Sequence, residues 1–128
     1  MDINDMRDVL ATKCLGLVYQ EPCKKWPTDA PVYLGGDLKW GPHSMFVSDW
    51  KPDENPVHLM WLIEAMQVQN FVLQMSVAIV DGEPYAFATC SRFDPEIMEY
   101  LFGQSQAEDQ GIAFAVCEAI YRALEGTR

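Results

Sequence analysis

The start of the chain alternates apolar and polar positions at the spacing of an amphipathic helix. Asp2 or Asn4 is suited to cap this helix, and the acidic residues of its first turn favour the positive end of the helix dipole. Gly16 marks the point where the helix frays. We therefore expect a helix over residues 3–17, with these positions on its buried face: Ile3, Met6, Val9 or Leu10, Cys14 and Leu17.

Two later segments show the same helical spacing. Asn55 is a good N-cap and Pro56 suits the first helical position, so a second helix is predicted from Pro56 to about Val68. A third helix is predicted to open with an S-x-x-E capping box at Ser105 and to end at Glu125, before a glycine. The apolar arc of this last helix is wide, which indicates contacts with two surfaces.

The strongest local signal is the hairpin "FVLQMSVAIVDGEPYAFATCS". It predicts strands over residues 71–80 and 84–91, joined by Asp81 and Gly82, a preferred pair for a two-residue turn. Apolar residues alternate along the first strand and place one row on one face. In the second strand, three small residues share a face and suit a closely packed helix: Ala86, Ala88 and Cys90.

The segment over residues 20–54 is rich in proline and tryptophan and does not suit a helix. "PVYLGGDLKW" predicts a hairpin that turns at residues 35–37, and "SMFVSDW" predicts a further short strand. The role of residues 92–103 stays open, because "DPEIMEYLFG" suits either a short helix or an edge strand.

The predicted order of elements is helix, hairpin, helix, hairpin, helix, which is typical of an α+β fold with an antiparallel sheet. At 128 residues, 49% of them hydrophobic, the chain suits a single domain over residues 1–128, with residues 20–54 as an excursion from it. Because helices both precede and follow the strands, we expect a single-domain layered α/β/α sandwich in which helices cover both faces of the sheet.

Four segments are spaced as in a known family, namely "ATKCLGL", "ENPVHLMWLIEAM", "FVLQMSVAIVDGEPYAFA" and "AEDQGIAFAVCEAIYRALE". Together they resemble the phage ABA sandwich domain family of small phage and prophage proteins, although a threonine usual in that family's closing helix is missing here. The resemblance covers most of the chain outside residues 20–54. It implies a similar fold and a phage source, and it brings no catalytic residues.

The net charge of −10 is distributed unevenly. Residues 20–52 contain four acids and four bases, whereas the rest of the chain contains fifteen acids and five bases. Long-range repulsion therefore argues against duplex DNA and anionic membranes as partners. The acidic N-terminus is unlike a signal peptide and no apolar run approaches the ~20 residues that span a bilayer. We expect a cytoplasmic protein, and the phage resemblance implies that it acts in the host bacterial cell.

No pattern in the chain names a reaction, a metal or a cofactor. The four cysteines form no C-x-x-C pair, and three of them lie in apolar patterns that predict core packing: Cys14, Cys90 and Cys117. His43 and His58 lie in different elements without a carboxylate pattern to join them. We therefore expect a protein that is not an enzyme and that needs no cofactor.

Aromatic residues lie among lysines in the segment from residue 24 to residue 51. Aromatic faces stack on nucleobases and lysines meet phosphates, so this composition suits a pocket for a nucleotide-like ligand. The alternative is that the same aromatic residues pack the hairpin onto the helices or form a dimer contact. The candidate ligand-binding residues are Lys24, Lys25, Trp26, Tyr33, Lys39, Trp40, His43, Trp50 and Lys51.

Three functions follow as hypotheses. The first is a phage protein that interferes with host antiviral defence by sequestering a nucleotide-like signal. The second is an acidic inhibitor that mimics nucleic acid and covers the basic groove of a host nuclease or CRISPR effector. The third is an accessory or structural phage protein that self-associates as a homo-oligomer.

Overall fold

The computed structural model describes residues 2–22, 30–35, 44–96, 98–107 and 111–125 of the chain. Its elements, in chain order, are α1 (Ile3–Val9), the π-helical turn η1 (Leu10–Cys14), β1 (Val18–Gln20), β2 (Val32–Leu34), β3 (Ser44–Phe46), the 3₁₀ turn η2 (Val47–Asp49), α2 (Pro56–Val68), β4 (Val72–Val80), β5 (Glu83–Asp94), β6 (Glu99–Ala107) and α3 (Gly111–Glu125).

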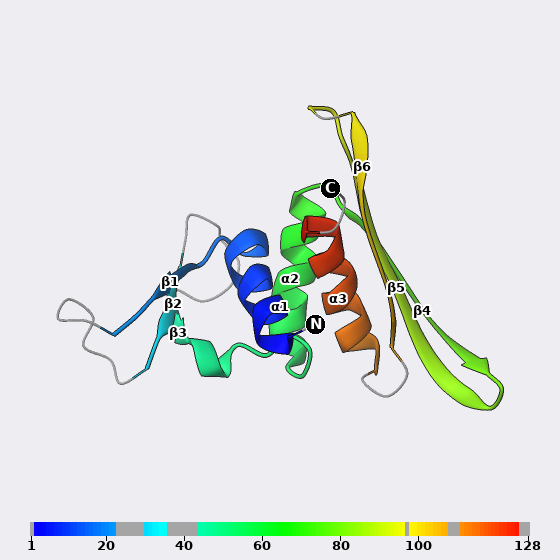
Figure 1. Cartoon of the computed structure of the whole chain (residues 1–128), viewed down its shortest axis with the longest axis horizontal. Coiled ribbons are helices and arrows are strands. Elements are labelled where there is room, and N and C mark those ends of the chain that lie inside the picture. Colours follow the sequence, from blue (N-terminus) through cyan, green and yellow to red (C-terminus); the bar gives the residue numbers. More distant parts are fainter. Residues whose placement is uncertain (1, 23–29, 36–43, 97, 108–110, 126–128) are drawn as a thin grey trace.

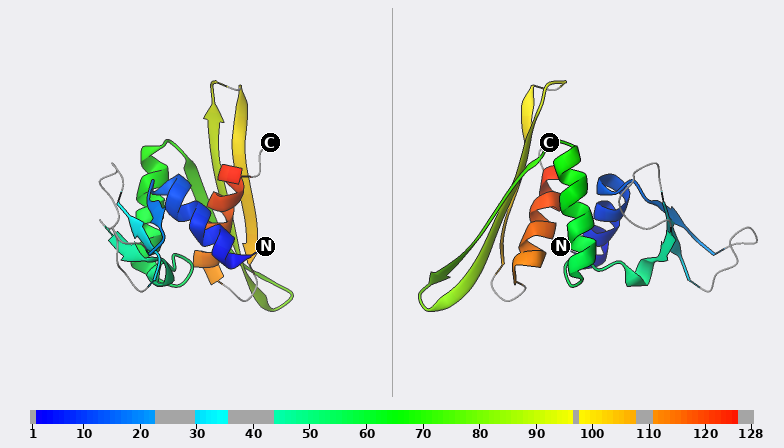
Figure 2. Two further views of the ribbon diagram at one scale, coloured as in Figure 1. Left: turned by 60° about the vertical axis from the view of Figure 1, so that its left-hand side comes forward. Right: turned by 180° about the vertical axis from the view of Figure 1, so that it is seen from behind.

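The strands form two antiparallel sheets, with the orders β1-β2-β3 and β4-β5-β6. The helices lie between them, with the longer sheet on one side and the smaller sheet on the other (Figure 1). The predicted α+β class and the antiparallel pairing are confirmed. The predicted α/β/α order is not confirmed, because α1 and η1 contact α2 and α3 instead of covering the free face of the longer sheet (Figure 2).

The first helix is shorter than predicted. Asp2 caps it as expected, since its carboxylate accepts a hydrogen bond from the backbone N–H of Asn4 at 2.8 Å. After Val9 the backbone widens into η1, and the N–H of Leu15 donates to the carbonyl of Leu10 at 3.3 Å. The chain then leaves the helix at Gly16, which has a φ of 71°, a conformation that glycine adopts at little cost.

Two local predictions are confirmed. α2 begins at Pro56 and ends at Val68, and the side chain of Asn55 accepts a hydrogen bond from the N–H of Val57 at 2.9 Å. β4 and β5 join through a two-residue turn in which Asp81 and Gly82 have φ values of 53° and 81°. Positive φ at both positions matches the turn type that suits the twist of a hairpin.

The small residues of β5 allow α3 to lie close to the longer sheet, as predicted. Ala86, Ala88 and Cys90 are 5%, 2% and 0% exposed. On the neighbouring strand, a side chain at Gly103 would overlap the backbone of Ala119 in α3. The close approach of helix and sheet therefore requires residues without bulk at this contact.

The predicted start of the last helix is wrong. Residues 105–107 belong to β6, and α3 begins at Gly111. The hydroxyl of Ser105 donates to the carboxylate of Glu118 at 2.6 Å instead of capping a helix. β6 pairs with β5 over residues 99–107 and completes a three-stranded sheet. The segment whose role was open in the sequence, residues 92–103, therefore contains the end of β5 and the start of β6.

The smaller sheet is only partly predictable. β2 and β3 fall within the expected strand segments, but β1 is an additional strand that pairs with β2. The predicted turn at residues 35–37 and the strand after it fall mainly outside the described residues. No helix in the described part of the chain is long and apolar enough to cross a membrane.

Candidate functional site

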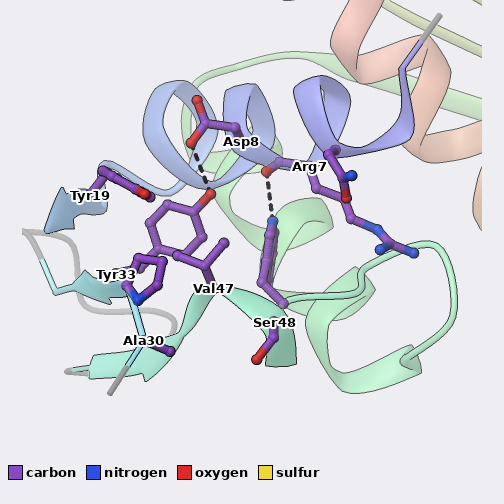
Figure 3. Close-up of a pocket in the computed structure, with 10 residues that line it drawn as sticks. Arg7, Asp8, Tyr19, Ala30, Tyr33, Val47 and Ser48 are labelled. Carbon is purple, nitrogen blue, oxygen red and sulfur yellow. Dashed lines mark hydrogen bonds between the residues drawn. The ribbon is translucent and has the colours of Figure 1, made fainter. Parts of the chain in front are cut away.

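A pocket of about 360 Å³ lies between α1 and the smaller sheet (Figure 3). Its lining combines aromatic and aliphatic walls with a few polar groups: Asn4, Arg7, Asp8, Tyr19, Ala30, Pro31, Tyr33, Val47, Ser48 and Trp50. The volume is near the lower end of the range of about 300–1,000 Å³ that ligand pockets occupy. A single planar ring system with small substituents therefore suits it better than a large ligand.

Tyr33 on β2 forms the inner wall and is only 1% exposed. Its hydroxyl donates to Oδ1 of Asp8 at 2.8 Å, so the smaller sheet is tied to α1 (Figure 3). Burial, followed by this hydrogen bond to Asp8, raises the pKa of the Tyr33 phenol well above its ordinary value. Tyr19 lies edge-on to the Tyr33 ring, with 6.1 Å between the centroids and an interplanar angle of 69°.

Trp50 forms a second wall and is also 1% exposed. Its indole N–H donates to the backbone carbonyl of Arg7 at 2.7 Å. Its ring stacks on His58 at a centroid distance of 5.1 Å, and His58 stacks in turn on Trp61 at 5.0 Å. Because this stack continues into α2, the pocket wall is held by the core of the protein.

Arg7 lies in the pocket lining, but its charge is already compensated. Nε and Nη2 donate to the two carboxylate oxygens of Asp53 at 2.8 and 2.9 Å, and Glu54 lies 3.6 Å from Nη2. The hydrogen bond with Asp53 is the main reason that the pKa of the guanidinium is raised. A phosphate bound here would have to compete with these carboxylates for the same donors.

Asp8 is the polar group that α1 presents beside the aromatic walls (Figure 3). Oδ1 accepts the hydrogen bond from Tyr33, whereas Oδ2 has no hydrogen-bond donor among the residues that the structure describes. A carboxylate oxygen in this position accepts hydrogen bonds from N–H or O–H groups of a ligand. Asn4 and Ser48 add amide and hydroxyl groups to the same lining.

Of the nine residues predicted to bind a ligand, two line this pocket, Tyr33 and Trp50. Lys51 is exposed and does not line the pocket, and its backbone N–H donates to Nδ1 of His58 at 3.1 Å. The other six residues lie outside the described part of the chain: Lys24, Lys25, Trp26, Lys39, Trp40 and His43.

The sequence did not point to a binding role for the four residues that α1 and β1 contribute, which are Asn4, Arg7, Asp8 and Tyr19. In the sequence, Arg7 and Asp8 look like ordinary positions on the polar face of an amphipathic helix. Tyr19 lies in a strand of three residues, which is too short to give a clear alternation. The one sequence feature that could have indicated this side of the pocket was an aromatic residue, Tyr19, close to the predicted end of the first helix.

The described thiols are not activated. Cys14, Cys90 and Cys117 are buried, and burial raises the pKa of both Cys14 and Cys90 to about 12. They are therefore protonated near neutral pH and are weak nucleophiles. Their predicted place in the core is confirmed. Among the described residues there is no group of three or more histidine, cysteine, aspartate or glutamate side chains arranged to hold a metal ion.

Comparisons of the chain with protein families, with curated proteins and with solved structures found no match. The resemblance to the phage ABA sandwich domain family therefore stays a prediction from the sequence.

Proposed function

We propose that this protein binds a small nucleotide-like ligand without transforming it, and that the ligand's ring enters the pocket between α1 and the β1-β2-β3 sheet. The observation that carries the proposal is the position of the Tyr19 ring, which is 42% exposed, beside the Asp8 carboxylate in a pocket that the buried rings of Tyr33 and Trp50 hold in shape. An exposed aromatic ring such as Tyr19 can stack on a nucleobase, and a carboxylate accepts hydrogen bonds from the N–H groups of the base.

The charges of the site favour recognition of a base over recognition of a phosphate. Arg7 is paired with Asp53, and Asp8 would repel an anion placed near it. A phosphate would instead need cations from elsewhere, and the lysines predicted for that role at positions 24, 25 and 39 lie outside the described residues. The pocket proposal therefore concerns the base-binding part of the ligand.

The buried, protonated thiols and the enclosed His58 support binding without chemistry. In a phage-encoded protein, such binding would sequester a nucleotide signal and so interfere with host antiviral defence. This biological role rests on the sequence resemblance and on the aromatic composition of the site. It is part of the same proposal.

Calorimetric titration with a panel of nucleosides, cyclic nucleotides and ADP-ribose tests the proposal. We expect at least one member of the panel to bind. We expect Tyr19→Ala to weaken that binding about ten-fold, since stacking of a base on an aromatic ring contributes ~1–3 kcal/mol. Asp8→Asn should weaken it as well, because it removes the carboxylate charge while keeping an acceptor for Tyr33.

Phe46→Ala is the matched control. Phe46 is 43% exposed and Tyr19 is 42% exposed, and both lie on the smaller sheet, but Phe46 does not line the pocket. The control variant should bind like the wild type. Absence of binding across the whole panel, or equal binding by wild type and Tyr19→Ala, would show that the proposed site is wrong.

A further inference from the structure

β4 is an exposed edge strand without the usual protection against pairing. It is nine residues long and pairs with β5 on one side, and no strand of the described residues pairs with its other side. Its sequence, VLQMSVAIV, contains no charged residue and no proline. Monomeric proteins commonly protect an edge of this length with charges, prolines or bulges.

The helix-facing side of β4 is apolar but uncovered. The strand register places Met75 opposite Ala88 and Val77 opposite Ala86, so these four residues share one face of the sheet. The two alanines are buried, whereas Met75 and Val77 are 48% and 67% exposed. α3 therefore covers the face along β5 and leaves the same face open along β4 (Figure 2).

Exposed apolar side chains lie on both faces of this strand. Ile79, on the same face as Met75 and Val77, is 77% exposed, and on the opposite face Val72 and Val80 are 57% and 44% exposed. An unpaired edge that is apolar on both of its faces indicates an interface.

We propose that a second copy of this chain binds this edge, in an antiparallel β4–β4 pair about a two-fold axis at Ser76. The strand is complementary to itself in this register. Met75 lies opposite the partner's Val77, Leu73 lies opposite the partner's Ile79, and Val72 lies opposite the partner's Val80. The two three-stranded sheets then form one six-stranded sheet whose apolar row is continuous across the interface.

The charges fit a second copy of the chain. Two chains of net charge −10 repel each other at long range, but the strand that would form the contact is neutral.

The length of the free edge fits a strand pair. Nine paired residues give an edge about 30 Å long. Main-chain hydrogen bonds along this edge, together with the apolar side chains on its two faces, would hold the two copies. This inference concerns the sheet on the far side of the helices from the pocket, so it does not depend on the proposed ligand.

Sedimentation of the full chain over a dilution series tests the dimer. We expect the wild type to have twice the 14.5 kDa mass of one chain. Val77→Lys places a charge beside the two-fold axis at an exposed position, so it should give a folded monomer. Val18→Lys makes the same change on β1 of the other sheet, where Val18 is 58% exposed, and should leave the dimer intact.

A wild type that stays monomeric at every concentration overturns the proposal. The free edge of β4 would then be a binding surface for a strand of a different protein. A Val77→Lys protein that remains dimeric also overturns it, because the contact must then lie elsewhere.

Cysteine cross-linking tests the register independently. Ser76 lies opposite its own copy, within the ~7 Å between Cα atoms that a disulfide needs. Ser76→Cys should therefore form a covalent dimer on mild oxidation, above the level seen for the wild type. Gln74→Cys changes an exposed residue on the same face, but its two copies would lie about 13 Å apart along the strands. Equal cross-linking of the two variants would overturn the register.

Discussion

At the scale of single residues, His58 is held in an environment that favours its neutral form. Its ring lies between Trp50 and Trp61, and Nδ1 accepts a hydrogen bond from the backbone N–H of Lys51. Burial is the main cause that lowers its pKa, and a weaker attraction from Asp49 opposes it. Protonation of Nδ1 would also remove the acceptor that Lys51 uses.

The lowered pKa makes a prediction about stability and pH. An unfolded histidine takes up a proton near pH 6.5, whereas folded His58 takes it up only at lower pH. The unfolded state therefore binds more protons in that interval, and the contribution of His58 to the free energy of unfolding falls as the pH drops below about 6.5. Urea unfolding at several pH values should show this loss for the wild type.

His58→Gln keeps an amide acceptor and does not titrate, so it is the control for this prediction. The difference in the free energy of unfolding between wild type and His58→Gln should shrink as the pH is lowered from 7.5 to 5. A difference that stays constant over this range would contradict the assignment. An NMR titration of the His58 ring should give a pKa below 6.5.

At the scale of elements, the contact between α3 and the longer sheet depends on Gly103. A Cβ at this position would overlap the carbonyl oxygen of Ala119 and the backbone nitrogen of Ala123. We expect Gly103→Ala to lower the free energy of unfolding by about 3 kcal/mol, because backbone atoms of a helix cannot move aside cheaply.

Gly82→Ala is the comparison for Gly103→Ala. Gly82 has a φ of 81° and no atom within 4 Å of an added Cβ, so the change brings backbone strain of about 1 kcal/mol without a clash. Both variants are compared by urea unfolding. An equal loss of stability in the two would show that α3 does not pack against β6 as closely as described.

The elements that the sequence predicted well are those set by local chemistry. Asn55 and Pro56 start α2, because the Asn55 side chain accepts a hydrogen bond from a backbone N–H of the first turn and proline suits the first helical position. Asp81 and Gly82 form the hairpin turn, because both adopt the positive φ that this turn requires. The prediction that Ser105 caps a helix was wrong, because its hydroxyl donates a hydrogen bond to the carboxylate of Glu118, which is 13 residues away. A tertiary contact of this kind cannot be read from spacing.

The end of α1 shows the same limit. Residues 10–14 keep the apolar spacing of a helix, yet the backbone opens into a π-helical turn. The thiol of Cys14 lies 3.8 Å from the carbonyl of Leu62, and the side chain of Gln69 donates to the carbonyl of Cys14 at 3.2 Å. These contacts with α2 and the residue after it belong to the packing of the whole chain, so the sequence pattern alone did not reveal them.

At the scale of the whole molecule, the helices separate two sheets that carry different proposed roles. The smaller sheet forms a pocket with α1, and the longer sheet presents a free edge (Figure 1). The sequence predicted Tyr33 and Trp50 as ligand-binding residues, but it did not predict the residues to which they donate hydrogen bonds. Asp8 is 25 residues from Tyr33 and Arg7 is 43 residues from Trp50, so only the fold brings these groups together.

The central claim is that the pocket between α1 and the smaller sheet binds a nucleotide-like ligand. Two-dimensional ¹H–¹⁵N NMR spectra test it most directly, with each member of the nucleotide panel added in turn and the Trp50 indole signal assigned from Trp50→Phe. The account predicts that a binding member shifts the Trp50 indole and the amide of Asp8, and leaves Phe87 in β5 unchanged. Spectra that no member changes, or changes confined to the β4-β5-β6 sheet, would contradict it.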